Sequence, residues 1–128
     1  MKLEFIHHVA TICSNYERSK KFYTEILGLP IIQETYRKER DSYKLDLAVG
    51  AQSQIELFSF PTPPPRLSYP EAAGLRHLAF AVSSVEETKK ELESNDIKVE
   101  PVRIDELTGK RYTFFNDPDG LPIEIYEI

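Results

Sequence analysis

Apolar and polar residues follow two different periods along this chain of 128 residues. Short alternating runs, typical of half-buried strands, surround one segment of helical spacing in each half. In the first half we predict a strand over 6–13, a helix over 14–28, and strands over 31–39, 43–49 and 54–60. Ser14 and Glu17 have the spacing of a capping box, and Gly28 suits the left-handed residue that follows a helix.

The same order of elements returns in the second half. Here we predict a strand over 75–82, a helix over 83–96, and strands over 98–104, 111–115 and 122–126. Three features recur in register: the capping box after 69 residues, the strand histidines His8 and His77 after 69, and the strand glutamates Glu56 and Glu124 after 68. Chance does not readily give such agreement, so the chain is predicted to contain two copies of one βαβββ module.

Prolines separate the two halves. Five of the nine prolines lie within 60–70, and proline has no amide hydrogen to donate to a sheet, so this stretch is predicted to be an extended connector. We expect one α+β domain over 1–128, with module one at about 1–60, the connector at 61–74 and module two at about 75–128. Each module alone is too small to bury its sheet well.

Each module places a histidine and a glutamate on the same side of its sheet. Successive side chains of a strand point to opposite faces, so His8 shares a face with Ala10 and is predicted to point away from His7. The residues predicted to form the opposite, helix-facing surface are Val9, Ile55, Leu57, Leu78, Ile123 and Ile125. The faces that carry histidine and glutamate are then the concave ones.

This set of side chains suits a divalent cation. A glutamate flanked by apolar residues is costly to bury without a partner, and imidazole with carboxylate is typical of Zn, Ni, Co and Fe sites. Four ligands leave positions for water or substrate, as a catalytic metal site requires. Because a lone strand histidine is more often structural, the prediction of a metal site at His8, Glu56, His77 and Glu124 rests on the repeat.

Composition narrows the class of protein. Charged residues make up 29% of the chain and the formal net charge is −5, which argues against a nucleic-acid binder. No apolar run approaches the roughly 18 residues of a membrane helix, and no secretory signal is visible. The one cysteine, Cys13, excludes an internal disulfide and is expected to be a small buried residue. We therefore expect a cytoplasmic protein that acts on a small molecule, with no nucleic-acid or membrane partner.

Short motifs then point to a family. The paired βαβββ halves, Phe22-Tyr23 before Leu27-Gly28-Leu29, and the turn Asn116–Gly120 before the last glutamate resemble the vicinal oxygen chelate superfamily. Within that superfamily the sequence resembles glyoxalase I-like (lactoylglutathione lyase-like) proteins over essentially the whole chain. The resemblance implies the glyoxalase/bleomycin-resistance/dioxygenase-like fold, in which two sheets curl around one metal, and commonly a homodimer.

The resemblance also implies a site and a reaction. The superfamily's metal positions fall on His8, Glu56, His77 and Glu124, in the order found in bacterial glyoxalase I. It implies one divalent ion, with Zn, Ni or Co favoured over Fe or Mn, acting as a Lewis acid on a 2-oxoaldehyde–thiol adduct. A carboxylate moves the proton between neighbouring carbons; this catalytic base maps to Glu124, with Glu56 as its opposed partner.

One departure from the family pattern concerns the thiol. Glutathione-dependent bacterial glyoxalases usually carry arginine and asparagine where this chain has Ile12 and Phe60. Glutathione or another thiol as cosubstrate therefore stays open, with Arg66 of the connector as a candidate contact. Two alternatives also stay open: another enzyme of the superfamily, such as an extradiol dioxygenase or a thiol transferase of antibiotic resistance, and a non-catalytic protein that binds a small ligand.

Overall fold

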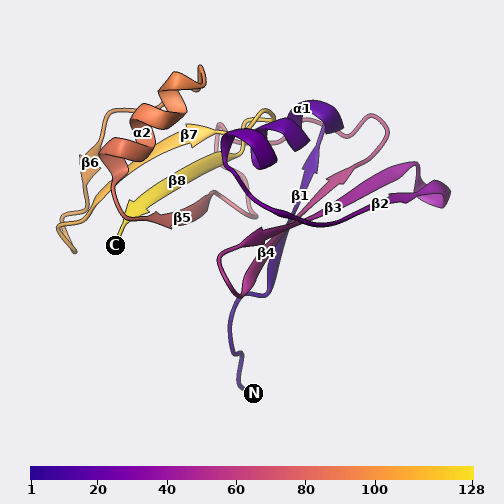
Figure 1. Cartoon of the computed structure of the whole chain (residues 1–128), viewed down its shortest axis with the longest axis horizontal. Coiled ribbons are helices and arrows are strands. Elements are labelled where there is room, and N and C mark those ends of the chain that lie inside the picture. Colours follow the sequence, from indigo (N-terminus) through magenta and orange to yellow (C-terminus); the bar gives the residue numbers. More distant parts are fainter. The chain divides into compact units, whose positions relative to one another are not determined.

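The computed structural model describes residues 1–128, which divide into two units, 1–65 and 66–128 (Figure 1). The first unit consists of β1 (His8–Cys13), α1 (Tyr16–Lys21), the π-helix η1 (Phe22–Ile26), β2 (Ile31–Arg37), the 3-10 helix η2 (Lys38–Arg40), β3 (Ser42–Val49) and β4 (Ser53–Ser59). Its four strands form one sheet in the order β1-β4-β3-β2, with β1 parallel to β4 and the other pairs antiparallel.

The core of the first unit lies between this sheet and the helices. Alternation along β3 and β4 sends every second apolar side chain to the helical side. The apolar residues of this unit that are at most 3% exposed are Cys13, Phe22, Tyr23, Leu45, Leu47, Ile55 and Leu57. Tyr16 of α1 adds to this packing, because its ring stacks on that of Tyr43 with centroids 4.3 Å apart.

The second unit repeats the arrangement. It consists of β5 (Leu78–Val82), α2 (Val85–Ser94), β6 (Arg103–Ile104), β7 (Arg111–Asn116) and β8 (Pro122–Glu127). The strand order is β5-β8-β7-β6, with β5 parallel to β8, and Figure 1 shows α2 lying across one face of this sheet. The residues buried on the helical side include Val85, Leu92, Phe115, Ile123 and Ile125.

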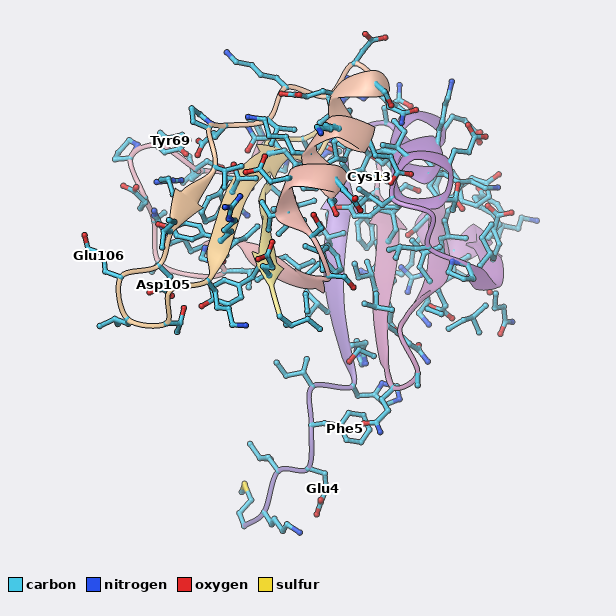
Figure 2. The ribbon with its side chains drawn as sticks, turned by 60° about the vertical axis from the view of Figure 1, so that its left-hand side comes forward. Glu4, Phe5, Cys13, Tyr69, Asp105 and Glu106 are labelled. Atoms are coloured by element: carbon cyan, nitrogen blue, oxygen red, sulfur yellow. The ribbon has the colours of Figure 1, made fainter.

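Both units confirm the predicted βαβββ order and the α+β class. Gly28 has the expected positive φ of 70°, and the amide of Leu29 donates to the carbonyl of Tyr23 across it. Residues 61–74 contain no helix or strand, as their prolines predict, and Figure 2 shows Tyr69 on this loop. The strand predicted to begin at residue 75 begins at Leu78. The single-domain extent and the module boundaries stay predictions. No helix is both long and apolar enough to cross a membrane.

Some element ends differ from the sequence prediction. The N-cap of each helix is one residue later than predicted: Asn15 replaces Ser14 and Ser84 replaces Ser83, each with an extended backbone, so the helices begin at Tyr16 and Val85. The Asn15 side chain accepts from the amide of Arg18, at 3.0 Å. The strand predicted over 98–104 is reduced to β6, since Pro101 cannot donate to a ladder.

The chain before β1 also differs from the prediction. The strand expected to begin at residue 6 begins at His8. The preceding residues form no helix or strand, and their apolar side chains are exposed, Phe5 by 56%. Figure 2 shows Glu4 and Phe5 on this segment, which runs away from the end of β1.

Candidate functional site

His8 and Glu56 lie together on the open face of the first sheet. Ala10 of β1 is the register partner of Glu56 on β4, and His8 lies two residues earlier on the same face. Nε2 of His8 is 3.5 Å from Oε2 of Glu56, and the two side chains are 44% and 16% exposed. The helical face of the same strands holds the apolar core, so this pair is directed away from the core.

His77 and Glu124 form the equivalent pair in the second unit. Ala79 of β5 is the register partner of Glu124 on β8, and His77 again lies two residues earlier. Nε2 of His77 is 3.1 Å from Oε2 of Glu124, with exposures of 31% and 14%. In both units the histidine thus stands two residues before the strand partner of the glutamate, although His8 begins β1 and His77 immediately precedes β5.

The donor atoms of each pair fit two ligands of one divalent ion. With metal–ligand bonds of about 2.1 Å, two donors on one ion lie about 3.0–3.4 Å apart, close to the distances found. Each unit contributes two of the four predicted ligands, and no group of three or more His, Cys, Asp or Glu side chains is placed to hold an ion. A complete centre would require both pairs, so the four-ligand site stays a prediction.

The first pair has a charged environment. Asp46 of β3 is directly opposite Glu56, and Nζ of Lys44 lies 3.2 Å from Oε1 of Glu56 and 3.0 Å from Oδ1 of Asp46. The hydrogen bond to Asp46, and after it the one to Glu56, raises the pKa of the Lys44 ammonium above its usual value. Glu56 thus has an ammonium group at one oxygen and an imidazole at the other.

The second pair has an aromatic environment. Phe114 of β7 is directly opposite Glu124, and its ring meets the His77 ring edge to face, with centroids 5.1 Å apart. A pocket of about 640 Å³ opens beside these two rings, within the size range of small-molecule sites. Its lining also includes Arg66, Lys98 and Arg103. The space for a ligand within this unit therefore adjoins His77.

Two side chains outside the ligand set carry predictions of their own, and that of a thiol contact for Arg66, which lines the pocket, stays a prediction. His7 was expected to point away from His8, and this is wrong: their Nδ1 atoms are 3.0 Å apart. His7 precedes β1, so strand alternation does not apply to it. The Arg66 guanidinium donates to Oγ of Ser68 and to the carbonyls of Leu75 and Arg76, and so fastens the loop just before His77.

Sequence reasoning missed Lys44 and Asp46, although the pattern contains a signal for them. The turn around Gly50 joins β3 to β4 with Val49 opposite Ser53, so counting back along both strands brings Asp46 to Glu56. Cys13 agrees with its prediction and is 2% exposed.

Comparison with known proteins identifies the family. The sequence profile of the Glyoxalase/Bleomycin resistance protein/Dioxygenase superfamily matches residues 5–125, and the chain belongs to this superfamily. It is 61% identical to the uncharacterized protein YwkD of Bacillus subtilis, over 99% of each chain. It is 55% identical to the uncharacterized protein YaeR of Escherichia coli, over 98% of this chain and 97% of that one. A solved glyoxalase family protein from Enterococcus faecalis is 49% identical over 99% of this chain and 100% of that one, with a TM-score of 0.91.

The names of more distant relatives state several different activities. They are glyoxylase I 4 of Arabidopsis thaliana and metallothiol transferase FosB of Staphylococcus saprophyticus, each 28% identical, and the putative ring-cleaving dioxygenase MhqE of Bacillus subtilis, 26% identical. This chain covers 71%, 77% and 42% of those three proteins, respectively. Membership of the superfamily is therefore compatible with more than one reaction.

Proposed function

We propose that this protein is a divalent-metal-dependent lyase or isomerase of the glyoxalase I type, acting on a small 2-oxoaldehyde–thiol adduct. The observation that supports it is the pairing of one histidine with one glutamate at the same register in both units, with donor atoms 3.5 Å and 3.1 Å apart. A protein that only encloses a ligand has no need for such a duplicated pair.

The metal in this proposal is held by His8, Glu56, His77 and Glu124, from one chain or from two chains of a homodimer. Two imidazoles and two carboxylates favour Zn, Ni or Co over Fe or Mn in our proposal, and the carboxylates neutralise the charge of the ion. When bound, the ion would provide Lewis-acid stabilisation of negative charge on substrate oxygens.

Glu124 is the proposed catalytic base. Glu56 is held from both sides, by His8 and by Lys44, whereas Glu124 has His77 as its ion-pair partner and an aromatic ring opposite it. Glu124 would take the proton from one carbon and return it to the next, with Glu56 as the opposed partner.

The thiol part of the substrate is proposed to differ from glutathione. Ile12 on the open face of β1 is 53% exposed, and Phe60, just beyond β4, stacks on Phe58 with centroids 6.1 Å apart. Both positions present apolar surface in place of the polar groups expected for a glutathione enzyme. Adducts of several thiols are therefore the appropriate substrates to screen.

The proposal is tested by the exchange of carbon-bound protons with deuterated solvent. The metal-loaded protein is incubated with 2-oxoaldehydes and several thiols, and deuterium incorporation is followed by NMR. Glu124→Gln should lower the exchange rate by about 10²–10⁴-fold, the usual contribution of a general base, while it retains some metal through its amide oxygen.

Glu56→Gln is the matched control for this experiment, since it makes the same change in the other pair. A larger loss in Glu56→Gln than in Glu124→Gln would reverse the two roles. If the metal-loaded parent exchanges no carbon-bound proton with any adduct, the isomerase mechanism is wrong, and the oxygen-dependent or binding alternatives replace it.

A further inference from the structure

The open face of the first sheet carries a guanidinium that has no carboxylate partner. Arg37 ends β2, and its register partner is Ser42 at the start of β3. Ser42 shares a face with Lys44, so Arg37 belongs to the same face as Glu56. Its Nη2 donates to Oγ of Ser42 at 2.9 Å, and none of the ion pairs of the protein includes Arg37.

Two phenylalanine rings support this guanidinium. Cζ of Arg37 lies 4.8 Å from the centroid of Phe58 and 5.8 Å from that of Phe60, and Cζ of Arg40 lies 5.0 Å from Phe60. The two rings are nearly parallel, with 9° between their planes. Stacking of this kind fixes the orientation of a guanidinium but uses none of its N–H donors.

The donors of Arg37 are incompletely satisfied. Nη1 has no partner in the protein, and Nε is buried without a hydrogen bond. A half-buried cation with unused donors and no counter-ion is an unfavourable arrangement unless an anion completes it. Carboxylate and phosphate groups match the planar fork of donors that a guanidinium presents.

Arg103 of the second unit has the same ring stacking as Arg37 but also has a carboxylate partner. Its Cζ lies over two rings in the same way, 5.2 Å from Tyr112 and 5.4 Å from Phe114. Its Nη2, however, is 2.8 Å from Oε2 of Glu100, so a carboxylate of the chain neutralises it. The stacking is common to both units, whereas the missing counter-ion is a feature of Arg37.

We infer that Arg37, with Arg40 beside it, is an anion-binding site for the carboxylate, phosphate or phosphonate group of a small ligand. Phe58, beneath Arg37, is two residues from Glu56 on the same face of β4, a separation of about 7 Å. A ligand anchored at Arg37 therefore extends toward Glu56. That this ligand is the substrate rests on the proposed function; the binding of an anion does not.

The site is tested by calorimetric titration of the full-length protein with inorganic phosphate and, separately, with acetate and methylphosphonate. The parent should bind at least one of these probes, and the affinity should fall as salt is added. Arg37→Gln should weaken binding about tenfold or more, as expected for loss of a charge-assisted hydrogen-bond pair. Arg40→Gln, at an exposed position, should weaken it about two- to fivefold.

Lys38→Gln is the matched control, because it removes one positive charge from the same 3-10 helix without a contact to either ring. The affinity of Lys38→Gln for the anion should stay within about twofold of that of the parent. The inference is wrong if the parent binds none of the three anions, or if Lys38→Gln weakens binding as much as Arg37→Gln. No metal and no adduct is present in this titration, so its result is independent of the proton-exchange test.

Discussion

The two units bring the same pair of side chains to the same register and surround it differently. Around Glu56, the cross-strand neighbour is Asp46, and Lys44 bridges the two carboxylates. Around Glu124, the corresponding positions hold Phe114 and Tyr112, which pack with His77 and Arg103. The two units thus share the candidate ligands and differ in the side chains of the neighbouring strand.

This difference suggests a division of roles under the proposed function. The charged neighbours of Glu56 restrain its carboxylate, which suits a ligand that stays in place. The rings of His77 and Phe114 line a pocket of about 640 Å³, and the Glu124 carboxylate has no ammonium neighbour. The second unit thus offers space for a small ligand beside His77, and the first unit offers the anion site inferred at Arg37.

Removing the bridge at Glu56 should make the first pair more like the second. Lys44→Met should tighten zinc binding by about two- to fivefold, because the ammonium competes with a cation for the Glu56 carboxylate and such pairs are worth about 0.2–1 kcal/mol. Competition with a chromophoric chelator measures this change. Lys20→Met is the control, since it removes an equal charge from a different carboxylate, that of Glu34. Weaker zinc binding in Lys44→Met would show that Lys44 positions Glu56 for the ion.

A smaller effect, on the free energy of unfolding, is expected from Glu34 on the helical side of the first unit. The Glu34 carboxylate accepts from Lys20 at 2.7 Å and from the hydroxyl of Tyr16, and these bonds, that of Lys20 first, lower the pKa of Glu34. The folded-state pKa is below that of the unfolded chain, so the carboxylate stabilises the fold above about pH 4.3, and this stabilisation is lost as the pH falls through the folded value.

Glu34→Gln should therefore lower the free energy of unfolding by less than about 1 kcal/mol at pH 7, since Glu34 is 36% exposed and solvent screens the pair. The difference from the parent should be smaller at pH 3 than at pH 7, because the carboxylate is protonated as the pH falls through its lowered pKa. Urea denaturation at the two pH values measures it. In the second unit, Glu86→Gln breaks the exposed pair with Arg111 and should have a still smaller effect. If Glu34→Gln lowers the free energy of unfolding as much at pH 3 as at pH 7, the ionised carboxylate of Glu34 does not stabilise the fold as described.

Much of this fold was predictable because the sequence contains the same module twice. Strand alternation and a repeat of 69 residues give the order of elements and the faces of His8 and His77 without any contact information. The N-caps were predicted one residue too early because two capping residues stand side by side in each module, Ser14-Asn15 and Ser83-Ser84. Only the backbone angles at the end of the preceding strand decide between them.

The surroundings of the site were harder to predict, since they depend on register between strands. Lys44 lies on a different strand from Glu56, and its role follows only when the β3–β4 pairing is known. His7 was misplaced because strand alternation was extended one residue beyond the start of β1. Arg37 appears in the sequence as one of sixteen basic residues, and only the structure distinguishes it by its missing counter-ion.

The central claim is that the histidine–glutamate pairs of the two units serve one metal ion. Metal content per chain, measured by mass spectrometry on the parent and on His8→Ala and His77→Ala, tests it most directly. We predict about one divalent ion per chain in the parent and loss of most of it in either variant, because each removes a ligand from the same ion. Two ions per chain, or full occupancy in the double variant His8→Ala, His77→Ala, would contradict the claim.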